Sequence, residues 1–146
     1  MSEIGSPVDV VIQLLSENMQ VVKEDGSLAK IQVSREWLSQ EALQQIDGHV
    51  TVGLAECLDT KLELGGKLRR RVYAIRVNVW SRDPLVRQKM VEEIMRVIRQ
   101  NRINPGGSLA YLDVVSFRDV DHVDVKPVIY RTEFVLRSWV FENLGV

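Results

Sequence analysis

The stretch YAIRVNVWSRDPLVRQKMVEEIMRVIRQN, residues 73–101, changes its hydrophobic period halfway along. Up to Trp80 apolar and polar residues alternate, which is the period of a half-buried strand. After Pro84 the apolar residues recur every three or four positions, which is the period of an amphipathic helix. Ser81 or Asp83 can cap this helix, and Pro84 suits its first turn. The stretch therefore predicts a strand that runs directly into a long helix.

A long hairpin is predicted immediately before this helix, over residues 49–80. The stretch His49 to Leu64 alternates, Gly65-Gly66 is a strong turn signal, and the second strand runs from Leu68 to Trp80. Gly53 is the candidate position for a β-bulge in the first strand. Simple alternation would place these residues on one face: Val50, Val52, Leu54, Glu56 and Leu58.

The N-terminal third predicts one helix and less regular structure after it. Ser6-Pro7 signals a helix start, and apolar residues at helical spacing predict a helix over residues 7–19. The turn KEDGS lies between Val21-Val22 and the alternation that contains Ile31, so these two stretches are expected to pair as a small hairpin. A short helix is expected over residues 39–46.

The C-terminal third predicts two more strands. Leu109 to Phe117 and Tyr130 to Phe141 both alternate, and residues 118–127 form a charged connection between them. The order is helix, strands, helix, strands. This order predicts a single α+β domain over residues 1–146, with an antiparallel or mixed sheet, a long helix packed across it and an N-terminal helix.

Composition excludes several classes of function. The 146 residues carry 19 basic and 20 acidic side chains, so there is no global attraction for nucleic acid, and no direct nucleic-acid recognition is expected. The single cysteine, Cys57, cannot form an intramolecular disulfide, which favours a reducing compartment. With no leader pattern and no run of roughly 20 apolar residues, we expect a cytosolic protein without a membrane partner.

The sequence shows no motif that favours catalysis. In DVDHVD, residues 119–124, strand alternation separates Asp119 from His122, so a solvated connection is favoured over a metal site. His49 is more typical of a structural or solvated position than of a catalytic one, and Cys57 is more typical of a small buried apolar side chain than of a nucleophile. No phosphate-binding loop or nucleophile elbow occurs. We therefore expect no enzyme activity, no catalytic or metal-binding residue and no cofactor.

Two groups of residues are candidates for contact with a partner. The run KLRRR, residues 67–71, stands beside the Gly-Gly turn and favours either a partner surface or a solvated edge. In the last strand Trp139 and Phe141 share a face with charged residues, so this face either contacts another subunit or lies under a second layer such as the N-terminal helix. The candidate interface residues are Lys67, Arg69, Arg70, Arg71, Asp119, Asp121, Asp124, Arg131, Glu133, Arg137, Trp139 and Phe141.

The order of several segments, and the pattern of apolar and polar residues within them, resemble those of a known family. A strand ending in VNVWSRD, a capped helix directly after it, a glycine-containing break, a strand with DVVSFRDV and a long final strand YRTEFVLRSWVF are similar to the tail terminator proteins of long-tailed bacteriophages and prophages. The resemblance covers residues 49–142. It implies a small α+β subunit that is made in the host cytoplasm and assembles into a ring, commonly a hexamer, in the virion tail.

In that family the ring caps the tail tube and presents a surface to the head-side connector, so the implied partners are further copies of the chain, the tube protein and the connector. A ring needs two different complementary patches on each subunit. The basic run 67–71 and the acidic residues Asp119, Asp121 and Asp124 would supply opposite charges. Two alternatives stay open: a neck or head-completion protein of the same region, and a small-molecule-binding α+β domain.

Overall fold

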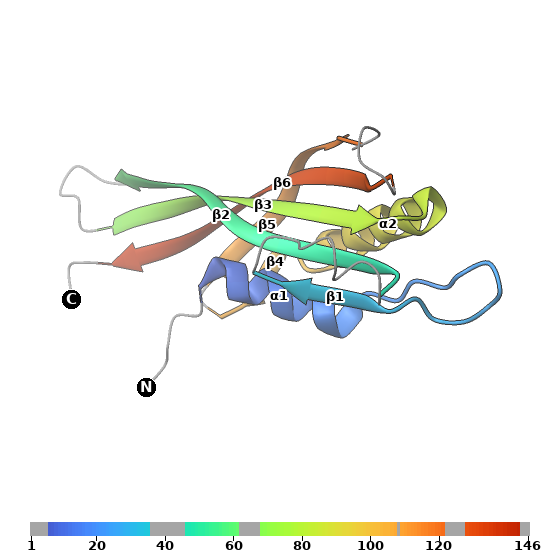
Figure 1. Ribbon diagram of the computed structural model, residues 1–146. Coiled ribbons are helices and arrows are strands. Elements are labelled where there is room, and N and C mark those ends of the chain that lie inside the picture. Colours follow the sequence, from blue (N-terminus) through green and yellow to red (C-terminus); the bar gives the residue numbers. More distant parts are fainter. Residues whose placement is uncertain (1–5, 36–45, 62–67, 108, 122–127, 144–146) are drawn as a thin grey trace.

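The computed structural model describes residues 6–35, 46–61, 68–107, 109–121 and 128–143. Within these residues it contains a six-stranded sheet, in the order β1-β2-β3-β6-β5-β4, and two helices (Figure 1). All neighbouring strands are antiparallel except β1 and β2, which are parallel, so the sheet is mixed and the predicted α+β fold class is confirmed. The elements are α1 Pro7–Asn18, β1 Ile31–Ser34, β2 Gly48–Lys61, β3 Leu68–Ser81, α2 Pro84–Gln100, β4 Ile103–Gly106, β5 Leu109–Asp119 and β6 Tyr130–Asn143.

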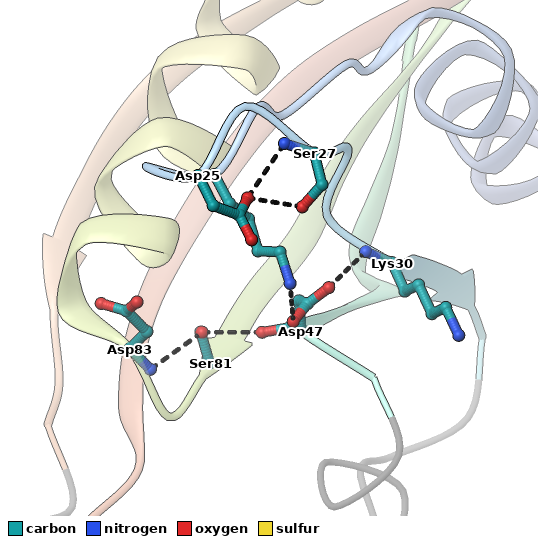
Figure 2. A network of polar contacts seen from close by, with 7 residues as sticks. Asp25, Ser27, Lys30, Asp47, Ser81 and Asp83 are labelled. Carbon is teal, nitrogen blue, oxygen red and sulfur yellow. Dashed lines mark hydrogen bonds and ion pairs between the residues drawn. The ribbon is translucent and has the colours of Figure 1, made fainter.

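The predicted passage from strand to helix is confirmed at the end of β3. The Asp83 carboxylate accepts a hydrogen bond of 2.9 Å from the backbone N–H of Leu85, which caps α2, and Pro84 occupies the first helical position. Ser81 braces the turn instead of capping the helix. Its hydroxyl donates to the Asp47 carbonyl at 2.8 Å and accepts from the Asp83 N–H at 3.1 Å (Figure 2).

Both helices pack on the same face of the sheet, which we call the core face. Val11 and Leu15 of α1 join Met90 and Ile94 of α2 in one buried cluster with the central strands. The buried residues that the sheet supplies to this cluster are Val50, Val52, Ile75, Val77, Val79, Leu112, Phe134 and Leu136. Because α1 belongs to this layer, it is not the second layer that could have covered the opposite face. Among the described residues, no helix is long and apolar enough to cross a membrane.

Two β-bulges interrupt the long strands, and the one in β2 places several residues on the face opposite to the predicted one. In β2 the bulge is at Ala55, between Leu54 and Glu56, and Gly53 pairs regularly with Arg76, so the predicted bulge position is wrong. The extra residue reverses the alternation, because each side chain beyond a bulge turns to the other face. Glu56 and Leu58 therefore lie on the face opposite to Val50, contrary to the prediction. A second bulge, at Val115, interrupts β5.

The predicted hairpin around KEDGS is also only partly correct. Val22 and Leu28 form an isolated antiparallel bridge, but the following strand, β1, pairs in parallel with β2. Asp47 directs this pairing from just before β2: its carboxylate accepts the Lys30 N–H at 2.6 Å, and its own N–H donates to the Lys30 carbonyl (Figure 2). The predicted start of α1 at Ser6-Pro7 is confirmed, although the Ser6 side chain makes no capping hydrogen bond. The predicted helix over 39–46 lies outside the described residues.

Candidate interaction surface

The sheet face turned away from the two helices, which we call the outer face, carries six of the twelve predicted interface residues, namely Arg70 of β3 and five residues of β6. In β6 the core-facing side chains Phe134 and Leu136 are fully buried. The residues between and beyond them point outward, as the alternation predicted. The outer-face residues of β6 are Arg131, Glu133, Val135, Arg137, Trp139 and Phe141. The sequence therefore assigned this face correctly.

Arginine guanidinium groups lie over tryptophan rings at two places on the outer face. The Arg131 guanidinium is 5.1 Å from the centre of the Trp80 ring. Arg70 and Arg137 are 5.1 Å and 5.6 Å from the Trp139 ring, which also stacks on Tyr111 at 4.1 Å. Each such contact is worth about 0.5–1 kcal/mol at an exposed site. Trp80 is only 5% exposed, so the accessible aromatic surface of this pair of sites is at the half-buried Trp139 and Tyr111.

Positive charge predominates on the described part of this face. Glu133 lies between two cations, 4.0 Å from Arg76 and 3.8 Å from Arg118. Glu56 and Asp113 are further acids on this face, and Arg70, Arg131 and Arg137 add three cations. Arginines beside aromatic rings are the side chains that most often dominate protein interfaces. The outer face thus suits a partner with an acidic surface.

The basic run 67–71 does not form a single patch. Lys67 lies outside the described residues. Arg69 and Arg71 turn to the core face and Arg70 to the outer face, because the run is part of β3. The Arg69 Nε donates to the Asp59 carboxylate at 2.9 Å, across the hairpin. The role of these residues in an interface stays a prediction.

Asp119 and Asp121 converge on Arg87 of α2. The Arg87 Nη1 is 2.6 Å from the Asp121 carboxylate and 3.6 Å from that of Asp119, which also accepts the Thr132 hydroxyl at 2.7 Å. These contacts tie the end of β5 to the start of α2. Asp124 lies outside the described residues, and within the described ones no three His, Cys, Asp or Glu side chains form a metal-binding group.

His49 and Cys57, both on β2, lie in different surroundings. His49 is 5% exposed, and its Nε2 is 2.8 Å from the Ser34 hydroxyl of β1. Burial lowers the pKa of His49 below its ordinary value of 6.5, because the charged form would lose its hydration. Cys57 is exposed, so its predicted burial is wrong, because it lies beyond the bulge in the part of β2 that the helices do not cover. The two residues therefore do not form a common site.

A shallow apolar hollow of about 260 Å³ lies beside the two bulges on the outer face. Leu58 and Val72 of the hairpin line it together with Val115 and Val135. Sequence reasoning missed this hollow, because it exists only once the bulge at Ala55 has turned Leu58 to the outer face. The adjacent valines 114 and 115 were the one available signal, since two neighbouring apolar residues break strict alternation.

Comparisons with known proteins establish the fold. No family model matches the chain, and no curated protein matches it in sequence. A search of solved structures finds a chain in the structure described as the virion of a native gene transfer agent particle. The two chains are 14% identical and superimpose with a TM-score of 0.65, over 93% of this chain and 95% of the other. At this identity the match shows a shared fold over nearly the whole length.

Proposed function

We propose that this chain is a structural subunit of a phage-like virion, and that it forms a ring which caps the tail tube and joins it to the head-side connector. The observation that carries the proposal is the fold shared with a chain of a virion over 93% of this protein. The segments that resemble tail terminators support the finer role, because they coincide with the β3-to-α2 junction, β5 and β6. In this role the activity is binding and assembly, and the protein belongs in the virion tail.

The outer face supplies the contact surface for the tube or the connector. Its aromatic rings are held by stacked arginines, so little side-chain freedom is lost when a partner binds. Phe141, 57% exposed at the end of β6, extends this surface with an apolar side chain. An acidic, partly apolar surface on the next protein of the tail would be complementary to it.

Removal of the protein from the particle tests this role. The coding sequence is deleted from the host that produces the particles, and the lysate is imaged by negative-stain electron microscopy. We expect heads and tails that are present but not joined, and complementation in trans should restore joined particles. Normal particles from the deletion strain would contradict the proposal.

The likeness to a virion chain fits a second role equally well, that of a neck or head-completion protein. The two roles differ in the first partner bound. Purified protein is sedimented with isolated tail tubes and, separately, with isolated connector-bearing heads. Co-sedimentation with tubes alone supports the terminator role, whereas co-sedimentation with heads alone supports the neck role and contradicts the terminator role.

A further inference from the structure

Two strand segments at opposite margins of the sheet are exposed along their whole length. Every residue of Leu54–Asp59 in β2 and every residue of Val115–Asp119 in β5 is exposed. We call them the β2 edge and the β5 edge. β1 pairs with β2 only as far as Thr51, and β4 pairs with β5 only as far as Tyr111. Among the described residues, no strand continues along either edge.

Open strand edges of this kind are pairing sites for another strand. Alternate backbone N–H and C=O groups point away from the sheet along an edge, and proteins usually protect them with charges, prolines or covering elements. Each edge here carries two charged residues and adjoins a bulge, but it also exposes two large apolar side chains. Leu54 and Leu58 are 52% and 55% exposed on the β2 edge, and Val115 and Phe117 are 60% and 50% exposed on the β5 edge.

A groove accompanies the β5 edge on the core face. It has a volume of about 640 Å³ and lies between α2 and β5, with Met95, Arg99 and Phe117 among its lining residues. The pairing of β5 with β4 ends just before this groove, where the Val114 N–H donates to the Asp113 carboxylate at 2.8 Å. A strand added to the β5 edge would place its core-facing side chains in the groove, against α2.

The charges of the two edges are complementary on the outer face. The β2 edge carries Glu56 on the outer face, whereas its other acid, Asp59 on the core face, is already paired with Arg69 at 2.9 Å. The β5 edge carries Arg118 on the outer face, and the groove beside it presents Arg99 and Arg102 on the core side. In a continuous sheet each side chain stays on its own face, so Glu56 of one copy would meet Arg118 of the next on the outer face. The other acid of the β5 edge, Asp119, is already held by Thr132 and Arg87.

We propose that the β5 edge of one copy pairs with the β2 edge of the next copy, so that the sheet continues from subunit to subunit. This inference rests on the proposed ring and identifies the contact between neighbouring subunits, which we call the seam. Neighbouring strands alternate in direction from β2 through β3 and β6 to β5, so a β2 edge that follows β5 in an uninterrupted sheet is antiparallel to it. Because the two edges differ, the contact is head-to-tail, as a cyclic ring requires.

The single cysteine of the chain provides a direct test. Cys57 is exposed on the β2 edge and lies on the core face, opposite Tyr73. In the full-length protein, Phe117→Cys adds a thiol on the core face of the β5 edge, and Ser116→Cys adds one on the outer face. Both variants are oxidised mildly and run on a non-reducing gel. Disulfides need Cβ atoms about 3.5–4.5 Å apart, so Phe117→Cys should give a ladder of multimers and about tenfold more product than Ser116→Cys.

Controls distinguish a failure of the proposed contact between the two edges from a failure of the proposed ring or function. Wild-type protein can form only Cys57-to-Cys57 dimers, and Cys57→Ser combined with Phe117→Cys should abolish the ladder. If light scattering reports a ring but Phe117→Cys gives no more product than Ser116→Cys, the seam is overturned and the ring stands. If the ladder forms but the deletion strain produces normal particles, the seam stands and the proposed function fails.

A charge exchange provides a second test that does not depend on Phe117, which stacks on Phe134. Glu56→Arg should lower the solution mass at a given concentration, because it places a cation against Arg118 of the neighbour. Arg118→Glu in the same chain should restore the mass. If Glu56→Arg leaves the mass unchanged, or if the double variant restores nothing, the proposed seam is overturned.

Discussion

The same long strands form two regions of opposite character. Beneath the helices, Val50 and Val52 of β2 are at most 1% exposed, whereas Leu58, past the bulge in the same strand, is 55% exposed. We call the second region the arm, Leu54–Lys61 of β2 with Leu68–Ala74 of β3. In Figure 1 the hairpin ends of β2 and β3 extend well away from α2. The covered half stabilises the fold, whereas Leu54 and Leu58 of the arm are mostly exposed, so they contribute little to it and are available to a partner.

The boundary between the two regions is built into the backbone. The bulges at Ala55 and Val115 lie immediately on either side of the row that contains Ile75 and Leu136. Bulges bend a strand and increase its twist. Together they bend the sheet along one line, and beyond that line the side chains of β2 exchange faces. The position of the bulges therefore decides which residues are buried with the helices and which face a partner.

The largest expected effect comes from the covered half. Phe134→Ala removes a fully buried ring from the core and should lower the free energy of unfolding by about 3–5 kcal/mol. Urea denaturation followed by circular dichroism measures the loss. The matched control is Phe141→Ala in the same strand, where the ring is 57% exposed and the change should stay within about 0.5 kcal/mol. Equal losses in the two variants would remove the distinction between the regions.

A smaller loss is expected where β2 begins. In Gly48→Ala the new methyl group would overlap the Met90 Sδ and lie 3.0 Å from the Ile31 Cδ1, so the core must shift. Overpacking of this kind costs about 1–3 kcal/mol. Gly53→Ala is the control, since nothing lies within 4 Å of a methyl group there. A Gly48→Ala variant as stable as Gly53→Ala in thermal unfolding would contradict this packing.

The pH dependence of the free energy of unfolding should show the protonation of His49, which lies next to Val50 in the covered half of β2. Its pKa is lowered in the folded protein, so the unfolded chain binds a proton more readily. The contribution of neutral His49 is complete above pH 6.5 and is lost as the pH falls through the folded-state pKa. Denaturation midpoints measured between pH 8 and pH 5 should fall more in the wild type than in His49→Gln. Parallel curves would show that His49 titrates alike in both states.

The smallest effect on folding, and a large one on assembly, is expected in the arm. Leu58→Asp changes a side chain that is 55% exposed, so the free energy of unfolding should change by about 0.5 kcal/mol or less. The added charge should nevertheless weaken association, because it enters the apolar hollow and the β2 edge. Sedimentation velocity at matched concentrations measures this. Full association together with unchanged stability would show that the β2 edge does not form the seam.

Much of the fold follows from local patterns in the sequence. The change of period between Trp80 and Pro84 predicted β3, α2 and its cap, because these depend on residues that are neighbours in the chain. The parallel pairing of β1 was not predictable in this way. It depends on Asp47 holding Lys30, 17 residues away. The Ala55 bulge was missed because Leu54 and Leu58 are four residues apart. An even spacing suggests that both lie on one face of an uninterrupted strand, whereas the bulge places them on opposite faces.

The candidate site was predictable only in part, for the same reason. Alternation alone placed Arg131, Arg137 and Trp139 on one face. The stacking of Arg70 on Trp139 needs the pairing of β3 with β6, and the convergence of Asp119 and Asp121 on Arg87 needs α2 to pack beside β5. These contacts join residues that are distant in the sequence, and no local period encodes them.

The central claim is that two different surfaces of the chain join into a closed ring, and the mass of the wild-type protein in solution tests it most directly. Light scattering over a concentration series should show a mass that rises and then stays at one multiple of 16.7 kDa, near six subunits or about 100 kDa. Negative-stain images of the same sample should show rings of one size. A mass that remains at one subunit, or one that grows without limit as concentration rises, would contradict the claim.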